Sequence, residues 1–277
     1  MKAFIVHFSH EFRAIIRDRS RLFMNYLFPL TVFLLMAALM TGVNPAFKQQ
    51  MIPAMILFAM MSSALLFLSS SWIAQREAGI YRSFRINGVP ARDILLAPAA
   101  ATIGHLAIVS VVIAIVAHFV FGAPFPTSPW LFVFGWLLSA LALAGLAMAI
   151  GVAVSEQRAG MLVAQLVFLP SILLGGLMMP ANLIPEGLSL VSRIFPARWA
   201  MEAMQAGGAD GEAGIAAVLV AQAVLAATAI AGYILARMLF EWHTLPSRTA
   251  RTRMAALLVL APALVGLSVL AFAERLA

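Results

Sequence analysis

The 277 residues are 63% apolar and only 10% charged, whereas a soluble domain is roughly half apolar and about a quarter charged, so the composition excludes an ordinary soluble fold. The net charge is +7, but the basic residues lie beside apolar stretches and form no continuous soluble patch, which argues against nucleic-acid binding. The chain has no cysteine, which excludes disulfides, thiolate metal sites and cysteine nucleophiles. We therefore predict an all-α integral membrane protein without a catalytic domain of its own.

Apolar, charge-free stretches set the number of predicted spans, because a span needs about 20 mostly apolar residues. Seven such stretches occur, at residues 22–40, 51–74, 94–121, 130–154, 161–179, 213–236 and 254–272. The connections leave no room for a soluble domain of even ~50 residues. We expect a six-span domain over 22–240, a basic cytoplasmic linker over 241–253 and a seventh span within 254–277.

The basic residues orient the predicted spans, because short cytoplasmic loops carry an excess of Lys and Arg. If the N-terminus lies in the cytoplasm, 14 of the 18 basic residues lie inside. The four left outside are Lys48, Arg193, Arg198 and Arg275. This distribution predicts a multi-pass protein of a bacterial inner (plasma) membrane with a cytoplasmic N-terminus.

Residues 1–21 carry too many charges for a secretory signal, since Glu11, Arg13 and Asp18 interrupt any apolar core. Their pattern is that of an amphipathic helix. The apolar residues that recur at helical spacing are Phe4, Phe8, Phe12, Ile15 and Ile16. We expect this helix to lie along the cytoplasmic membrane interface.

The loop over residues 75–93 is longer than a connector between two spans needs to be. It begins with a charged turn, continues as a short helix-compatible run around residues 77–84, and stops at residues 87–90. There Gly88 permits a left-handed turn and Pro90 prevents continuation of the helix. We expect a small helix that another protein contacts.

The loop over residues 180–212 is too apolar to be solvated, yet Pro180, Pro185 and Pro196 break it too often for a single span. Irregular backbone is tolerated at membrane depth only where protein shields it. We expect a pair of short helices that dip back into the outer leaflet.

These two loops resemble those of the type-2 ATP-binding-cassette permease family, in its daunorubicin-exporter-like branch, and the resemblance covers about residues 1–240. The inner loop matches the family pattern at Glu77, Gly79, Arg85, Gly88 and Pro90. The stretch after the fifth span matches it at Gly176, Pro180, Pro185 and Pro196. Arg82 departs from the pattern, since many members have an acidic residue there.

The resemblance implies that two copies, or this chain and a sister permease, form a dimeric translocation path powered by two separate ATPase subunits, which bind the ATP and Mg. The chain itself has no Gly-rich loop ending in Gly-Lys-Ser or Gly-Lys-Thr, so we expect it to bind no cofactor or metal. The implied ATPase-coupling residues are Arg76, Glu77, Gly79, Ile80, Arg82, Phe84, Arg85, Gly88 and Pro90. Ile80 and Phe84 would be apolar anchors, surrounded by the charged residues. The implied outer gate comprises Pro180, Pro185, Phe195, Pro196 and Trp199.

Polar side chains within the spans are candidates for lining a path. His105 and His118 are 13 residues apart, about 19 Å along a helix, so they cannot share a proton or a metal directly, and a structural or pore-lining role is favoured. Serines of the second span either line a polar path or hydrogen-bond back to their own helix. Glutamines should point inward, because an amide facing lipid would be unpaired. The candidate path residues are Ser62, Ser69, His105, Gln165 and Gln222.

Small residues on the fourth span, at Gly145, Ala149 and Ala153 and in a second row through Gly151, predict close helix packing.

Three functions compete. The first is the membrane-spanning subunit of an ATP-driven exporter of an amphipathic drug, lipid or glycan-linked substrate. The alternative is a secondary, ion-coupled transporter, which would need an acidic residue inside a span, yet every Asp and Glu falls at a loop or a span end. An intramembrane enzyme would need convergent nucleophile, base or metal ligands, and the sequence shows no such group.

Overall fold

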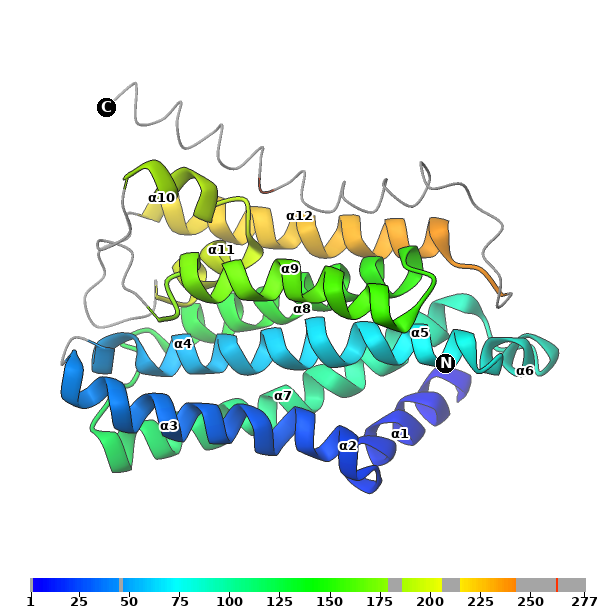
Figure 1. Ribbon diagram of the computed structural model, residues 1–277, viewed down its shortest axis with the longest axis horizontal. Helices are drawn as coiled ribbons and strands as arrows, with labels where there is room; N and C mark the ends of the chain where they lie inside the picture. Colours follow the sequence, from blue (N-terminus) through cyan, green and yellow to red (C-terminus); the bar gives the residue numbers. More distant parts are fainter. Residues whose placement is uncertain (1, 45–46, 179–185, 206–214, 243–262, 264–277) are drawn as a thin grey trace.

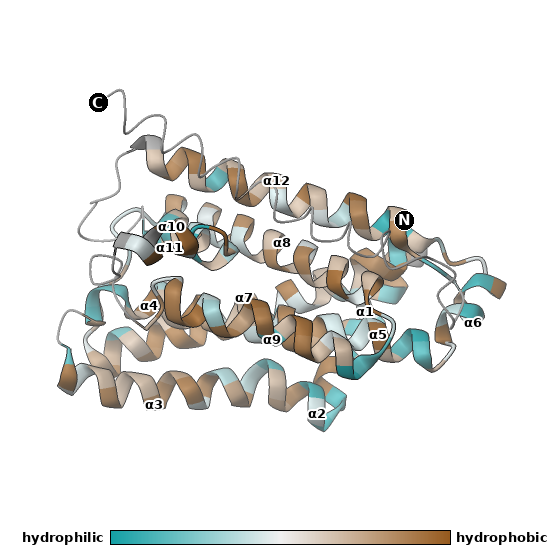
Figure 2. Ribbon diagram, turned by 45° about the horizontal axis from the view of Figure 1, so that its top comes forward, coloured by the Kyte–Doolittle hydropathy of each residue, from teal (hydrophilic) through white to brown (hydrophobic). Residues whose placement is uncertain are grey.

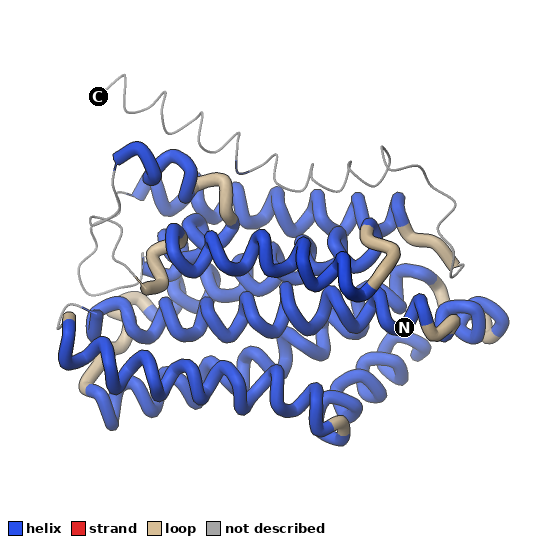
Figure 3. Tube along the Cα trace, viewed as in Figure 1, coloured by secondary structure: helices blue, strands red, loops and turns tan. Residues whose placement is uncertain are grey.

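The computed structural model describes residues 2–44, 47–178, 186–205, 215–242 and 263, and every regular element among them is a helix. The long helices run side by side along the long axis of the molecule (Figure 1), and the described loops lie at the two ends of the bundle (Figure 3). Six helical stretches are long and apolar enough to cross a membrane: Arg19–Val43, Phe47–Glu77, Ala91–Phe121, Pro129–Ala153, Gln157–Leu174 and Ala217–Leu239. The all-α, six-span prediction is confirmed, while the predicted seventh span at 254–272 falls almost wholly outside the described residues.

The first two spans are composite, because each contains a π-helical segment. The first consists of α2 (Arg19–Leu22), η1 (Phe23–Leu27) and α3 (Phe28–Val43). The second consists of α4 (Phe47–Met61), η2 (Ser62–Leu68) and α5 (Ser69–Glu77). Such wide turns are rare and are frequently found at functional sites. Nothing in the sequence marked them in advance.

The remaining elements are four single-helix spans and four shorter helices. The spans are α7 (Ala91–Phe121), α8 (Pro129–Ala153), α9 (Gln157–Leu174) and α12 (Ile215–Leu239). The others are α1 (Lys2–Arg17), α6 (Ile80–Ile86), α10 (Glu186–Ser192) and α11 (Pro196–Gln205). Most spans extend a few residues beyond the predicted apolar stretches, because polar residues continue each helix. The described part of α9, however, ends at Leu174, since Gly175 and Gly176, with φ of +88° at Gly176, follow it.

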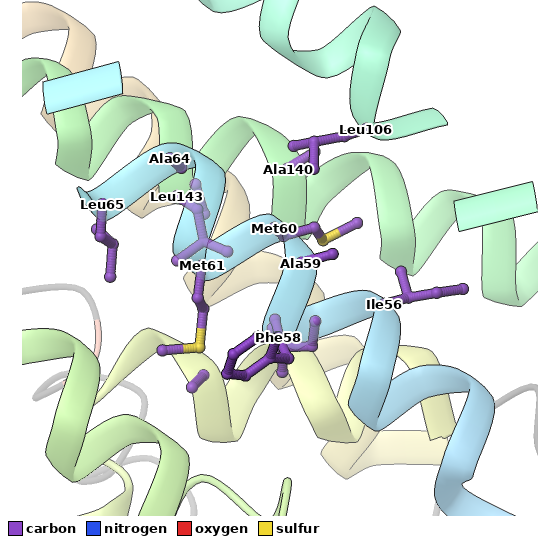
Figure 4. Close-up of a cluster of buried hydrophobic side chains, with 14 of the residues drawn as sticks. Ile56, Phe58, Ala59, Met60, Met61, Ala64, Leu65, Leu106, Ala140 and Leu143 are labelled. Carbon is purple, nitrogen blue, oxygen red and sulfur yellow. The ribbon is translucent and has the colours of Figure 1, made fainter. Parts of the chain in front are cut away.

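The second span is the centre of the bundle. In its most apolar window 89% of the residues are buried, against 22% in the first span. The second span therefore lies in the core, and the first span lies at the periphery of the bundle. Figure 4 shows Ile56, Met60 and Met61 of this span beside Leu106 of α7 and Leu143 of α8. A helix that is apolar all round is one that must be buried on all sides. The hydrophobic outer surfaces of the other spans (Figure 2) suit lipid or a second protein.

The small residues of α8 allow its close approach to two neighbours. A Cβ atom added to Gly232 of α12 would lie 2.4 Å from the backbone of Gly145, so these two backbones touch. A Cβ on Gly151 would lie 3.1 Å from Trp72 and from the Ser69 carbonyl oxygen of α5. The predicted close packing is confirmed, and the two rows of small residues serve contacts within this chain.

Candidate functional site

The short helix predicted in the inner loop is α6, which projects from one end of the bundle (Figure 1). Gly79 has φ of +71° and Gly88 has φ of +69°, a region that favours glycine, so each permits a sharp change of direction. Val89 N–H donates to the Phe84 carbonyl oxygen (3.0 Å), and Pro90 precedes α7. The predicted end of the helix is confirmed. Its start is three residues later than predicted, because Glu77 still belongs to α5.

One side of α6 is fastened to the bundle and the other side is exposed. Tyr81 is 3% exposed, its hydroxyl donates to the Trp72 carbonyl oxygen (2.9 Å), and burial raises the pKa of its phenol. Phe84 is half-buried, with its ring centroid 5.2 Å from that of His7 in α1. Ile80 is 40% exposed and Ile86 is 78% exposed. Phe84 therefore contributes to internal packing, and Ile86, absent from the predicted set, is the most exposed apolar side chain of α6.

Arg82 and Arg85 are exposed on α6, as expected for residues around an apolar contact, but Arg76 is not. Arg76 is 5% exposed, and its guanidinium donates to the carbonyl oxygens of Gly151 (3.3 Å), Val152 (3.0 Å) and Val154. The last carbonyls of a helix have no partner within it, so Arg76 satisfies part of the C-terminus of α8. Its positive charge also suits the negative end of that helix. The expectation that Arg76 borders a partner contact is corrected, because the side chain is used inside the chain.

Glu77, the next residue, contacts the start of α9, the helix that follows α8 after a short turn. Its carboxylate accepts a hydrogen bond from the backbone N–H of Gln157 (3.0 Å), the first residue of α9. A negative charge is favourable at the N-terminus of a helix. Arg76 and Glu77 thus bind the end of α8 and the start of α9, and we call this pair the α5 clasp. It links the end of α5, from which α6 emerges, to two further spans.

α1 packs beside this region through an unexpected set of residues. Its buried line is His7, Glu11 and Ile15, spaced at four residues, whereas Ile16 of the predicted apolar set is 53% exposed. Glu11 contacts Arg21 (Oε2 to Nη1, 3.2 Å) and lies 3.6 Å from His7 Nε2. Burial by itself would raise the pKa of Glu11, but His7 and the Arg21 guanidinium outweigh it and lower the pKa from its usual 4.5. The pairing of Glu11 with Arg21 and His7 thus helps to hold α1, so its buried face is not purely apolar.

His105 is fully buried and has a partner for each ring nitrogen. Nε2 lies 2.9 Å from the Phe12 carbonyl oxygen, which can only accept, so Nε2 carries the proton. Nδ1 then accepts from the Tyr26 hydroxyl (2.5 Å). His118 contacts the Ala123 carbonyl oxygen (2.9 Å) and stacks on Phe125. Both histidines join neighbouring segments, which favours the structural role.

The other candidate path residues divide between the interior and the surface. Ser62 donates to the Ala59 carbonyl oxygen (3.0 Å) and Ser69 to that of Leu65, so both hydroxyls bond back to their own helix. Gln222 is 8% exposed, with its amide nitrogen unpaired among the described residues.

Gln165 does not point inward within this chain. It lies on the exposed face of α9, and exposed leucines precede and follow it at helical spacing. They are Leu162, Leu166, Leu169 and Leu173.

The opposite end of the bundle carries α10 and α11 (Figure 1). A Cβ atom on Gly135 of α8 would lie 2.5 Å from the Ala203 carbonyl oxygen of α11. Gly135 is six residues beyond the start of α8 at Pro129, a depth of about 9 Å at 1.5 Å per residue, so α11 lies alongside the spans. The described residues thus contain the expected short helices, while Pro180 and Pro185 of the predicted gate lie outside them.

The remaining gate residues lie in α11 and directly before it. Trp199 is fully buried, and its indole N–H donates to the Arg193 carbonyl oxygen (2.6 Å). Pro196 is buried as the first residue of α11, and Phe195 is half-buried just before it. Arg193 also stacks on Trp199, with its guanidinium carbon 5.4 Å from the ring centroid.

Buried charges of the same segment converge on one carboxylate. Glu202 is 8% exposed and binds Arg198 (Oε1 to Nε, 2.9 Å) and Arg193 (Oε1 to Nη2, 3.5 Å). The two arginines compensate the charge that α11 carries into the bundle. Among the described residues, no three His, Cys, Asp or Glu side chains are placed to hold a metal ion.

The chain is similar to a known family of membrane transporters. The family model described as ABC-2 type transporter matches residues 2–207, about three quarters of the chain. No curated protein matches the chain. The match includes α6, the α5 clasp and α11. Together with six helices long enough to cross a membrane, it shows that the chain is a multi-pass membrane protein that belongs to the ABC-2 type transporter family.

Proposed function

We propose that this chain is the permease subunit of an ATP-driven exporter and that α6 is the helix that receives the ATPase. The observation that carries the proposal is a short helix, fastened on one side by Tyr81, with Ile80 and Ile86 exposed on its other sides. Exposed apolar side chains flanked by Arg82 and Arg85 fit a groove on another protein, with the arginines setting orientation. ATP and Mg belong to two separate ATPase subunits.

Movement of α6 reaches several spans through the α5 clasp. Because Gly79 separates α6 from α5 by a single turn, a displacement of α6 acts directly on the end of α5. Arg76 and Glu77 connect that end to α8 and to α9. A push on one short helix would thereby tilt three spans together and open a path between permease subunits.

The path would lie between this chain and a second permease, either another copy or a sister chain. The support is the exposed face of α9, where Gln165 lies between Leu162 and Leu169. An amide is costly in lipid without a hydrogen-bond partner, so this face suits protein or a polar path better than acyl chains. The proposed substrate is an amphipathic drug, lipid or glycan-linked molecule, and the N-terminus and α6 would be cytoplasmic in a bacterial inner membrane. The helices α10 and α11 would then restrict the outer exit.

The buried Glu202 bears on the alternative of an ion-coupled transporter, because it is an acidic residue that lies alongside the spans. Its carboxylate already binds two arginines, at 2.9 Å and 3.5 Å. An ion-coupled transporter needs an acidic residue that is free to bind the ion within a span, whereas this carboxylate is held in two ion pairs within the chain. The ATP-driven reading is therefore preferred.

The proposal is tested by isolating the full-length chain from its native membranes with its associated proteins. We expect an ATP-binding-cassette ATPase to copurify and to hydrolyse ATP in proteoliposomes. Transport should then require ATP and continue when protonophores and sodium ionophores dissipate ion gradients. Transport that persists without any ATPase but stops with the ionophores would support the ion-coupled alternative instead.

A further inference from the structure

α1 has a second face that contacts no other described helix. We define this open face by Ile5, Val6, His10, Arg13 and Arg17. Ile5 is 59% exposed, Val6 is 70% exposed, and the three basic residues are exposed as well. The buried line through His7, Glu11 and Ile15 lies on the other side of the helix. The open face therefore combines apolar and basic groups that nothing described so far uses.

The positive charge of the open face is not neutralised within the described residues. Glu11, the only acidic residue of α1, is on the buried side and paired with Arg21. The carboxylate of Asp18, just after α1, accepts the N–H groups of Ser20 (2.8 Å) and Arg21 (3.2 Å) and caps α2. Arg13 and Arg17 thus form no ion pair in the described part of the chain.

An open hollow of about 730 Å³ lies along this face and is lined only by α1 and Asp18 among the described residues, so it offers room for an amphiphile to lie along the helix without enclosing it. Arg13 and Arg17 are four residues apart and His10 is three before Arg13, so all three side chains can approach one anion. Ile5 is eight residues before Arg13, about 12 Å along the helix. The hollow thus has an apolar end and a basic end, and Asp18 also lines the basic end with its carboxylate bonded to the N–H groups of Ser20 and Arg21.

The position of α1 selects the kind of amphiphile. Only Asp18 separates α1 from the first span, which begins at Arg19, so the basic end of the face lies where a span meets lipid headgroups. We propose that the open face of α1 binds one anionic phospholipid, with the phosphate on Arg13 and Arg17 and an acyl chain along Ile5 and Val6. A nucleotide or a free phosphate would leave the apolar end exposed to water.

Such a lipid would hold α1 from the side opposite its protein contacts. Phe12 stacks on His105 of α7 with ring centroids 4.0 Å apart, and His7 contacts Phe84 of α6. An anionic lipid that fixes α1 therefore stabilises the position of α6 without touching it.

The test uses the full-length protein in detergent and native mass spectrometry with three probes: dioctanoyl phosphatidylglycerol, dioctanoyl phosphatidylcholine and inorganic phosphate. We expect phosphatidylglycerol to bind more tightly than either of the others. The Arg13→Gln/Arg17→Gln variant should weaken its binding roughly tenfold to thirtyfold, since each basic residue near a membrane surface contributes about fivefold and the variant removes two. Arg13→Lys/Arg17→Lys should retain it.

The matched control is Arg82→Gln/Arg85→Gln, which removes two exposed charges from α6 and should leave lipid binding unchanged. Neither pair contacts the core, and the thermal unfolding midpoint verifies that each variant is folded. Equal binding of the two lipids, equal binding of inorganic phosphate, or unchanged binding by the Arg13→Gln/Arg17→Gln variant would each overturn the proposal.

Discussion

The short helices at the two ends of the bundle, α6 and α11, each carry an aromatic side chain bonded to a backbone carbonyl but differ in exposure. Tyr81 donates to the Trp72 carbonyl oxygen, and Trp199 donates to that of Arg193. Yet α6 leaves most of its side chains exposed, whereas α11 buries eight of its ten residues. The bond of Tyr81 joins α6 to α5, whereas that of Trp199 closes the turn before α11. The neighbouring side chains decide whether each short helix is exposed or buried.

The charged residues at the two ends are arranged in opposite ways. Arg76 and Glu77 diverge from one point to the ends of two helices. Arg193 and Arg198 converge on the single carboxylate of Glu202. The first arrangement links the end of α5 to two further spans, and the second compensates the charge of one buried carboxylate.

The largest expected effect comes from breaking the α5 clasp at its buried side. Arg76→Met should destabilise the chain by roughly 2–4 kcal/mol, because it leaves several carbonyl oxygens at the end of α8 without their donor. It should also separate ATP hydrolysis from transport. Thermal unfolding in detergent and ATPase assays in proteoliposomes measure the two effects. Arg237→Met is the control, since the Arg237 side chain is exposed and forms no ion pair in the described part of the chain.

Arg76→Lys sharpens the same test. It keeps the charge but loses the planar guanidinium that reaches several carbonyls, so an intermediate effect is expected. If Arg76→Met and Arg76→Lys are both as stable as the wild type and couple ATP hydrolysis to transport equally well, the clasp is not needed.

The closed end should be sensitive to volume. Gly135→Val places new atoms within 2.5 Å of the Ala203 carbonyl oxygen, and overpacking of this kind costs about 1–3 kcal/mol. The same substitution at Gly42, where nothing lies within 4 Å, is the matched control. Comparison of the two unfolding midpoints tests whether α11 is packed as tightly as described. Equal midpoints would mean that α11 moves freely and that the contrast between the two ends fails.

Ile80→Ala together with Ile86→Ala should weaken ATPase association by about 1–2 kcal/mol, because apolar anchors dominate such interfaces. Removing the exposed charges with Arg82→Gln/Arg85→Gln should have a smaller effect that depends on salt. Quantitative copurification at two ionic strengths separates these contributions. Ile108→Ala on the outer surface of α7 is the control, being similarly exposed at 47%. An unaffected ATPase interaction in the isoleucine variant would remove α6 from the coupling role.

The spans and α6 were predictable because their causes are local. Long apolar stretches make spans, and Gly88 with Pro90 ends a short helix whatever surrounds it. The α5 clasp was not predictable, because Glu77 binds a backbone group 80 residues away and Arg76 binds carbonyls 75 to 78 residues away. In the sequence, Arg76 is one more basic residue beside a span, and only the packing shows that it is buried.

The buried face of α1 and the position of Gln165 were missed for related reasons. Helical spacing groups the phenylalanines of α1, but the burial of Glu11 depends on Arg21, which follows a break in the helix. Gln165 was expected to point inward because lipid disfavours its amide. That argument holds for the whole assembly and not for one chain, so an exposed glutamine is compatible with a second permease covering it.

The smallest expected effect concerns Glu11, which helps to hold α1 beside α6. Its pKa is lower in the folded chain than its usual 4.5, because the stabilisation of the carboxylate by His7 and Arg21 outweighs the cost of burial. A lowered pKa contributes stability that is complete above about pH 4.5 and is lost as the pH falls through the folded-state value. Glu11→Gln should therefore lower the unfolding midpoint slightly at pH 7 and remove part of its fall below pH 4.5. Glu156→Gln, which also removes one exposed carboxylate, is the control for the change in net charge. If the Glu11 variant and the wild type lose stability in parallel on acidification, the carboxylate contributes nothing to fixing α1. The support that α1 gives to α6 would then have to come from the ring contacts of Phe12 with His105 and of His7 with Phe84.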